Sequence, residues 1–152
     1  MNPLWKIAHH FSNVCTWGGH IVSKIFWMLS CVIFANSVAA ETQIGEGTIF
    51  YHHAIGCVTH ANAKIGKNCK IFANVTLGAK WGGGERDEDS YALPVVGNNV
   101  VIGAGAVLLG KVTVGDNVVI GANAVVITDV PSDCYAVGVP AKIFARKQQV
   151  WR

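Results

Sequence analysis

An aliphatic residue recurs at every sixth position through the C-terminal half of this 152-residue chain. The residue four places after each of them is always small or β-branched. The first set is Val96, Ile102, Leu108, Val114, Ile120 and Val126, and the second is Val100, Ala106, Val112, Val118, Ala124 and Val130. This period with these residue types predicts a parallel β-helix, in which short strands alternate with sharp turns and three hexads make one coil.

The turns of such a coil need residues that tolerate a positive φ, and the sequence supplies them at a fixed place. Three positions after the aliphatic residue, the predicted corners are Gly47, Asn68, Asn74, Asn99, Gly105, Lys111, Asn117, Asn123 and Asp129. The period slips by three residues across "IFYHHAIGCVTHAN" (49–62). Counted from Phe50, His53 falls at a corner position, where its side chain would point outward.

Residues 1–40 are predicted to form a helical lead-in to a β-helix domain of residues 41–152. Two segments with helical spacing of apolar residues, separated by Gly18 and Gly19, indicate a helical hairpin. We expect its apolar face to pack on the rest of the protein or on a sister subunit, with peripheral contact to a membrane as the alternative. The apolar run at 25–41 is too short to span a bilayer and begins too late for a signal peptide. The apolar positions are Leu4, Ile7, Ala8, Phe11 and Val14, then Ile21, Ile25, Met28, Leu29 and Val32.

Composition limits the possible partners and compartment. The chain is 51% hydrophobic and 14% charged, which suits a single compact unit. Its formal charge of +3 includes no run of Lys and Arg interleaved with aromatic residues, so nucleic acid is not an expected partner. Five scattered cysteines, an odd number, are typical of free thiols in a reducing compartment, which predicts a cytoplasmic protein.

Residues 44–142, which include "IGEGTIFYHHAIGCVTHANAKIGKNCKIFANVTLGAKWGGGER" and "GVPAK", resemble the hexapeptide acyltransferases, specifically their serine-acetyltransferase-like branch. The helical lead-in is similar to that of capsule and O-antigen polysaccharide acetyltransferases. The resemblance implies an all-β fold, a left-handed parallel β-helix with a short α-helical N-terminal segment. It also implies an enzyme that uses acetyl-CoA without a metal, assembled as a homotrimer. The six-residue period stops between Leu77 and Val96, which predicts an extruded loop at 79–95.

The resemblance assigns the catalytic and cofactor residues. His53 matches the histidine that acts as general base, taking the proton of an acceptor hydroxyl as it attacks the acetyl-CoA thioester. No covalent intermediate is required, so Cys57 is expected to be a packed thiol. The residues expected to line the slot for acetyl-CoA are Gly78, Ala79, Gly103, Ala104, Ala122 and Lys142.

The acceptor site departs from the serine acetyltransferase pattern. The residue before the base is His52, where those enzymes carry an aspartate, and the loop retains only Arg86 of their Asp-Arg-His set. Because an ammonium group without carboxylate partners binds poorly, we favour a sugar hydroxyl of a surface polysaccharide or its precursor. The predicted acceptor residues are Tyr51, His52, Trp81, Arg86 and Asp87. Serine O-acetylation is the alternative.

Two other functions are compatible with the repeat. Carbonic anhydrases of the gamma class use the same coil with a zinc ion, but this chain has no histidine after His60, and His53, Cys57 and His60 match no zinc ligand set. A non-catalytic scaffold is the other, since a fold does not fix a function. The "GVPAK" segment at 138–142 argues against it, because in the resembling family this segment lies beside the cofactor.

Overall fold

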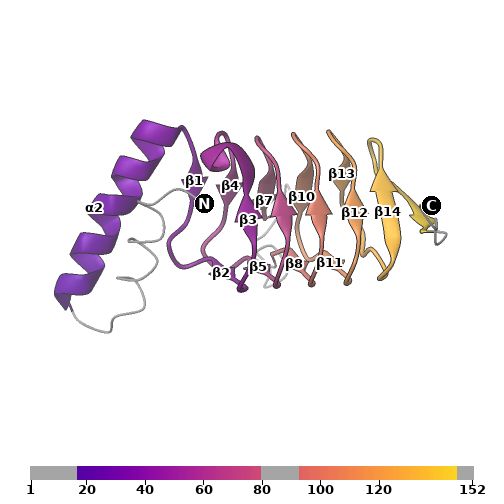
Figure 1. The fold of residues 1–152 in the computed structure, drawn as a ribbon, viewed down its shortest axis with the longest axis horizontal. Helices are drawn as coiled ribbons and strands as arrows, with labels where there is room; N and C mark the ends of the chain where they lie inside the picture. Colours follow the sequence, from indigo (N-terminus) through magenta and orange to yellow (C-terminus); the bar gives the residue numbers. More distant parts are fainter. Residues whose placement is uncertain (1–16, 80–92, 147–152) are drawn as a thin grey trace, which may run out of the picture.

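The computed structural model describes residues 17–79 and 93–146, which form one helix followed by a three-sided column of short strands (Figure 1). The first sheet contains β1 (Ser37–Val38), β4 (Val58–Thr59), β7 (Thr76–Gly78), β10 (Val107–Leu109) and β13 (Val125–Val126). The second contains β2 (Gln43–Ile44), β5 (Lys64–Ile65), β8 (Val95–Val96) and β11 (Thr113–Val114). The third contains β3 (Ile49–Phe50), β6 (Lys70–Ile71), β9 (Val101–Ile102), β12 (Val119–Ile120), β14 (Cys134–Val137) and β15 (Lys142–Ala145).

The chain visits the three sheets in turn, so each coil adds one strand to every side of the column. All pairings are parallel except that between β14 and β15, a hairpin at the C-terminal end. This is the predicted left-handed parallel β-helix. Strand β1 lies within the segment predicted as the helical lead-in, and residues 80–92 of the predicted loop lie outside the described residues.

The core consists of the two predicted sets of hexad residues. All twelve of them are buried, none more than 2% exposed. Equivalent residues stack directly from coil to coil, as where Leu108 pairs with Leu77 on one side and Val126 on the other. Burial of each such side chain contributes about 1.5–3 kcal/mol, so the six-residue period is the main determinant of this fold.

Seven of the nine predicted corners adopt the left-handed conformation, with φ between +55° and +75°. Lys111 and Asp129 do not, and the prediction was wrong for them. They lie in turns that lead from the first sheet to the second, where Gly110 takes the positive φ and the Asp129 carboxylate instead accepts a 2.7 Å hydrogen bond from the Thr113 amide. Asparagines at other corners bond to each other between coils, as Asn99 does to Asn117.

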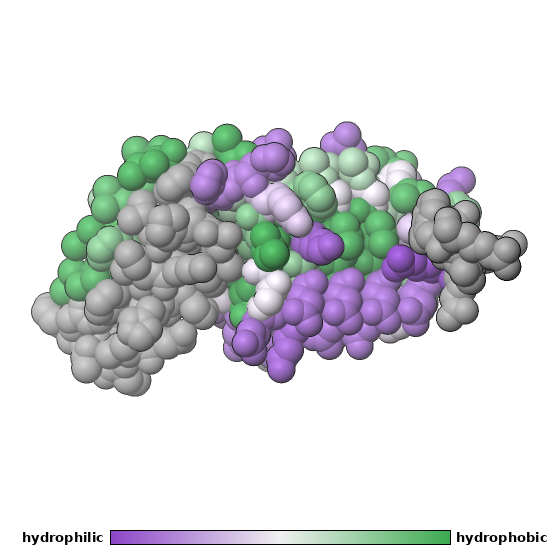
Figure 2. Space-filling model, in the orientation of Figure 1, coloured by the Kyte–Doolittle hydropathy of each residue, from purple (hydrophilic) through white to green (hydrophobic). Residues whose placement is uncertain are grey.

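Helix α2 (Trp17–Phe34) packs beside β1 at the start of the column. It begins before Gly18 and Gly19, so these glycines do not separate two helices as predicted, and the first predicted segment (4–14) lies outside the described residues. The predicted apolar face of α2 does not pack on the described part of the protein. Its five residues, Ile21, Ile25, Met28, Leu29 and Val32, are each 39–78% exposed, and Figure 2 shows hydrophobic residues along the outer edge of the helix. A sister subunit or a membrane surface remains the predicted partner. Among the described residues, no helix meets the length and hydropathy needed to cross a bilayer.

Candidate functional site

The slip in the six-residue period is a three-residue insertion in one turn. The inward residues Phe50 and Thr59 are nine positions apart instead of six, and the turn between them leads from the third sheet to the first. Gly56, with a φ of +65°, stacks over the regular corner residue Asn74, whose amide donates to the carbonyl of Ile55 at 2.9 Å. The residue count predicted that His53 occupies the corner position of its hexad. This prediction was wrong, because Gly56 occupies that position.

The insertion forms a left-handed turn of three consecutive residues. His52, His53 and Ala54 have φ of +52°, +58° and +62°. For residues with a side chain this conformation costs roughly 1–2 kcal/mol each, and such strain concentrates at functional sites. Ala54 is buried in the core, whereas both histidines are exposed. The turn thus adopts an unfavourable backbone conformation, and its two imidazole side chains project from the column.

Several contacts hold this turn. The Tyr51 ring stacks on Phe72 of the next coil, with centroids 4.8 Å apart and planes 10° from parallel. Backbone hydrogen bonds run from the Ile55 amide to the His52 carbonyl at 3.1 Å and from the Cys57 amide to the Ala54 carbonyl at 2.9 Å. The carbonyl of His53 accepts a hydrogen bond from the side-chain amide of Asn36, at 3.3 Å. The predicted acceptor residues Tyr51 and His52 are therefore beside His53.

We call the turns from the third sheet to the first (51–57, 72–75, 103–106 and 121–124) the histidine corner. Gly103, Ala104 and Ala122 all lie on it. With neighbouring strands about 4.8 Å apart, Ala104 is about 10 Å and Ala122 about 14 Å along the column from the level of His53. Exposed Lys142, on β15, lies further along in the same direction. This row of small residues ending at a cation could hold an extended thioester with a phosphorylated end.

Five other predicted residues are not brought to this corner by the described structure. Gly78 and Ala79 lie at the end of β7, on the opposite edge of the first sheet, where the Gly78 carbonyl accepts a bond from the Gly110 amide. Trp81, Arg86 and Asp87 lie outside the described residues.

The described carboxylates avoid the histidine corner. They are Glu41, Glu46, Asp116, Asp129 and Asp133. Each belongs to a turn from the first sheet to the second or from the second to the third. The described residues at the histidine corner thus offer imidazoles, a phenol ring, the side-chain amides of Asn74 and Asn123, and backbone groups, but no carboxylate.

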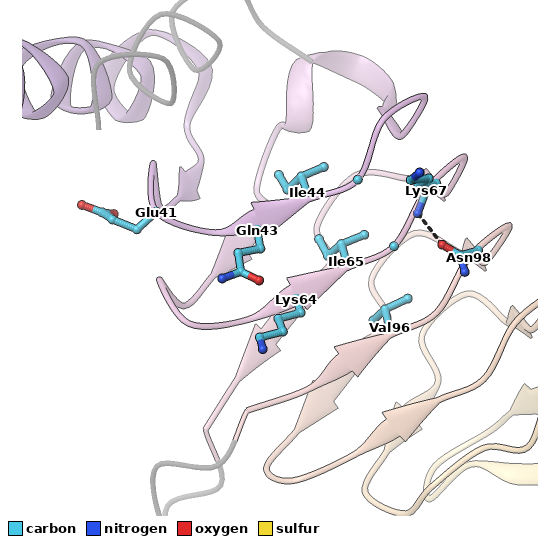
Figure 3. Close-up of a pocket in the computed structure, with 10 residues that line it drawn as sticks. Glu41, Gln43, Ile44, Lys64, Ile65, Lys67, Val96 and Asn98 are labelled. Carbon is cyan, nitrogen blue, oxygen red and sulfur yellow. Dashed lines mark hydrogen bonds between the residues drawn. The ribbon is translucent and has the colours of Figure 1, made fainter. Parts of the chain in front are cut away.

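A groove of about 610 Å³ lies elsewhere on the column (Figure 3). Its polar lining includes Glu41, Gln43, Lys64 and Lys67 over the second sheet, and the Lys67 amide donates to the Asn98 side chain at 2.9 Å. In Figure 3, Gln43 and Lys64 project from their strands. The groove faces away from the histidine corner, so its size does not make it the site of the predicted chemistry.

The buried cysteines are structural. Cys57 and Cys69 are fully buried, and burial raises the pKa of both thiols above its ordinary value. The Cys57 thiol donates to the carbonyl of Phe72 at 3.3 Å. This agrees with the prediction of a packed thiol. In the described part of the chain, no three His, Cys, Asp or Glu side chains converge as metal ligands would.

Asn36 is the residue that the sequence reasoning missed. It precedes the first hexad, outside the repeat, so no position of the six-residue period points to it. The register of the first sheet identifies it as a core position. Asn36 precedes β1 by one residue and is level with Cys57, which precedes β4 by one residue. A polar residue at a core position could have been noticed once the strand at Ser37–Val38 was known.

Known proteins are similar to this chain in sequence and in fold. The model of the bacterial transferase hexapeptide (six repeats) matches residues 94–128. Serine acetyltransferase of Synechococcus elongatus is 38% identical over 126 residues, 83% of this chain and 49% of that protein. The serine-bound structure of Neisseria gonorrhoeae serine acetyltransferase has a TM-score of 0.77 at 32% identity, over 93% of this chain and 54% of that one. A serine acetyltransferase in complex with CoA has a TM-score of 0.76 at 32% identity, with the same 93% and 54% coverage.

The chain spans about half the length of these relatives. The structural likeness nevertheless extends over 93% of this chain. The chain therefore carries the hexapeptide repeat of bacterial transferases, with a sequence and a fold similar to those of serine acetyltransferases.

Proposed function

We propose that this protein is an acetyl-CoA-dependent O-acetyltransferase in which His53 is the general base. The observation that carries the proposal is the strained three-residue turn, which projects His53 at one end of a row of small residues that leads to Lys142. The similarity to a serine acetyltransferase solved with CoA supports the choice of acyl donor.

In this mechanism the imidazole of His53 removes the proton of an acceptor hydroxyl while the oxygen attacks the thioester carbonyl. The tetrahedral intermediate collapses with loss of the CoA thiolate, which takes the proton from the imidazolium. An imidazole suits the task because its ordinary pKa is near neutral, and such a base commonly contributes a rate factor of about 10²–10⁴. Gly103, Ala104 and Ala122 would line the pantetheine arm, and Lys142 would attract the phosphates.

For the acceptor, the comparisons favour L-serine over the sugar hydroxyl that the sequence pattern favoured. The relatives are named as serine acetyltransferases, and one solved structure is a complex with serine. We therefore propose L-serine as the acceptor.

A sugar hydroxyl is the second candidate, for one specific reason. The ammonium group of serine would find no carboxylate among the described residues of the histidine corner, and an unpaired charge is costly to desolvate. Its partners would have to come from Asp87 and its neighbours in the loop or from another subunit. A polyol would need only hydrogen bonds and an aromatic face, which Tyr51 and His52 could supply.

A homotrimer in the cytoplasm is the assembly we propose. Ile55 lies on the histidine corner and Ile49 and Val58 lie next to it, and the three side chains are 43–47% exposed. Clustered exposed aliphatic side chains of this kind mark surfaces that another chain covers. Light scattering after gel filtration should give about three times the chain mass of 16.2 kDa; a monomeric mass would refute the assembly.

The test of the activity is a thiol-release assay with acetyl-CoA, offering L-serine and, separately, a panel of sugars and nucleotide sugars. His53→Ala should lower the turnover about 10²–10⁴-fold. His60→Ala is the matched control, because His60 is also exposed but lies at a different corner of the column. Turnover with a sugar and not with serine would transfer the proposal to the second candidate. Undiminished turnover in His53→Ala would remove His53 from the mechanism.

A further inference from the structure

Asn36 is one of three buried polar residues among the described residues of the column, together with Thr42 and Thr59. The strand register of the first sheet aligns it with Cys57, Val75, Ala106 and Ala124, one residue before β1, β4, β7, β10 and β13. Asn36 is 5% exposed and the others at most 1%. Since burying a side-chain amide is unfavourable unless it is hydrogen-bonded, its presence here requires a bonding role.

The side-chain amide of Asn36 is hydrogen-bonded to the histidine turn. Its Nδ2 donates to the carbonyl oxygen of His53 at 3.3 Å. The backbone on both sides of Asn36 is fixed against the same turn: the Gly56 amide donates to the Ala35 carbonyl and the Ser37 amide to the Cys57 carbonyl, each at 2.8 Å. The backbone of Asn36 is thus held in place by its neighbours, and its side-chain amide extends to the inserted residues.

We propose that Asn36 is a positioning residue for His53; this inference rests on the proposed function. A left-handed turn of residues with side chains has more relaxed alternatives, and the peptide that follows His53 can rotate toward them. A hydrogen bond to the His53 carbonyl opposes that rotation, so it fixes the direction in which the imidazole leaves the backbone. Catalysis is sensitive to this direction, because a misplacement of about 1 Å can cost a factor of about 100 in rate.

The decisive variant is Asn36→Val. Val75 already occupies an equivalent buried position in the first sheet, so valine fits this row of residues while it removes the hydrogen-bond donor. The matched control is Thr42→Val, which removes a buried side-chain donor to the carbonyl of His60, at another corner of the same coil. For both variants, kcat and KM are measured with acetyl-CoA and L-serine, together with the melting temperature. The imidazole resonance of His53, assigned with His53→Ala, is followed by NMR.

We expect Asn36→Val to lower kcat roughly 10–100-fold with KM for acetyl-CoA near the wild-type value, and to shift or split the His53 resonance. Thr42→Val should lower the melting temperature but leave kcat and the resonance unchanged. An equal loss of kcat in Thr42→Val, or an unaltered His53 resonance in Asn36→Val, overturns the proposal. Wild-type turnover in His53→Ala would instead refute the proposed function, while the NMR comparison would still decide the role of Asn36.

Discussion

Two adjacent leucines on β10 allow a sharp test of the coil. Leu108 points into the column and is fully buried between Leu77 and Val126, whereas Leu109 points outward and is half-buried. Leu108→Ala should lower the free energy of unfolding by about 2.7–5.0 kcal/mol, the sum of the lost transfer energy and a cavity that the stacked coils cannot fill. For a chain of this length, that corresponds to a fall in melting temperature of roughly 5–20 °C.

Leu109→Ala is the control, because it removes the same side chain from the same strand. It should lower the free energy of unfolding by about 1 kcal/mol. Both variants are unfolded thermally and in urea, at two protein concentrations, so that a loss at a subunit interface is recognised by its dependence on concentration. If Leu109→Ala costs as much as Leu108→Ala at both concentrations, the inward and outward alternation assigned to β10 is wrong. The register of every strand stacked on it would then be wrong as well.

Three further outcomes follow from single residues. Ala35→Gly should raise the free energy of unfolding by about 1 kcal/mol, because Ala35 has a φ of +47° directly after α2 ends; unchanged urea unfolding would contradict this. Burial raises the thiol pKa of Cys57 and Cys69, so the unfolded chain loses these protons first and stability should decline as the pH rises above the ordinary thiol value of 9.0. The decline should be smaller in the double variant Cys57→Ala, Cys69→Ala. Lys142→Ala should raise KM for acetyl-CoA up to roughly fivefold with kcat unchanged, as expected for an exposed ion pair, and an unaltered KM would remove Lys142 from the phosphate site.

The sequence predicted the coils because a periodic core leaves a periodic pattern. Val96 to Val126 could be assigned to the interior by counting, and the corner asparagines by their tolerance of positive φ. Counting failed at His53, since a residue count cannot distinguish a shifted corner from an inserted turn. It failed at Asn36 because its partner, the carbonyl of His53, is 17 residues away and is a backbone group with no sequence signature.

The acceptor could not be predicted for a different reason. Recognition of a small polar molecule depends on a few directional groups, and His52 can be read either as a lost aspartate or as a new hydrogen-bonding group. The described structure of the histidine corner is compatible with both interpretations, because it presents Tyr51 and His52 without a carboxylate from the described residues. Only the relatives shift the balance toward serine.

The insertion at the histidine corner also explains how a regular column can carry an irregular site. Inward positions are fixed by the need to fill a narrow core, so three extra residues cannot be absorbed along a strand without turning polar groups inward. They are forced into a turn, where Phe50 and Thr59 still meet the core on either side. There the backbone accepts a left-handed conformation, Ala54 fills the gap beneath, and the two histidines can only point outward. The same periodicity that makes the fold predictable therefore determines where the chain can depart from it.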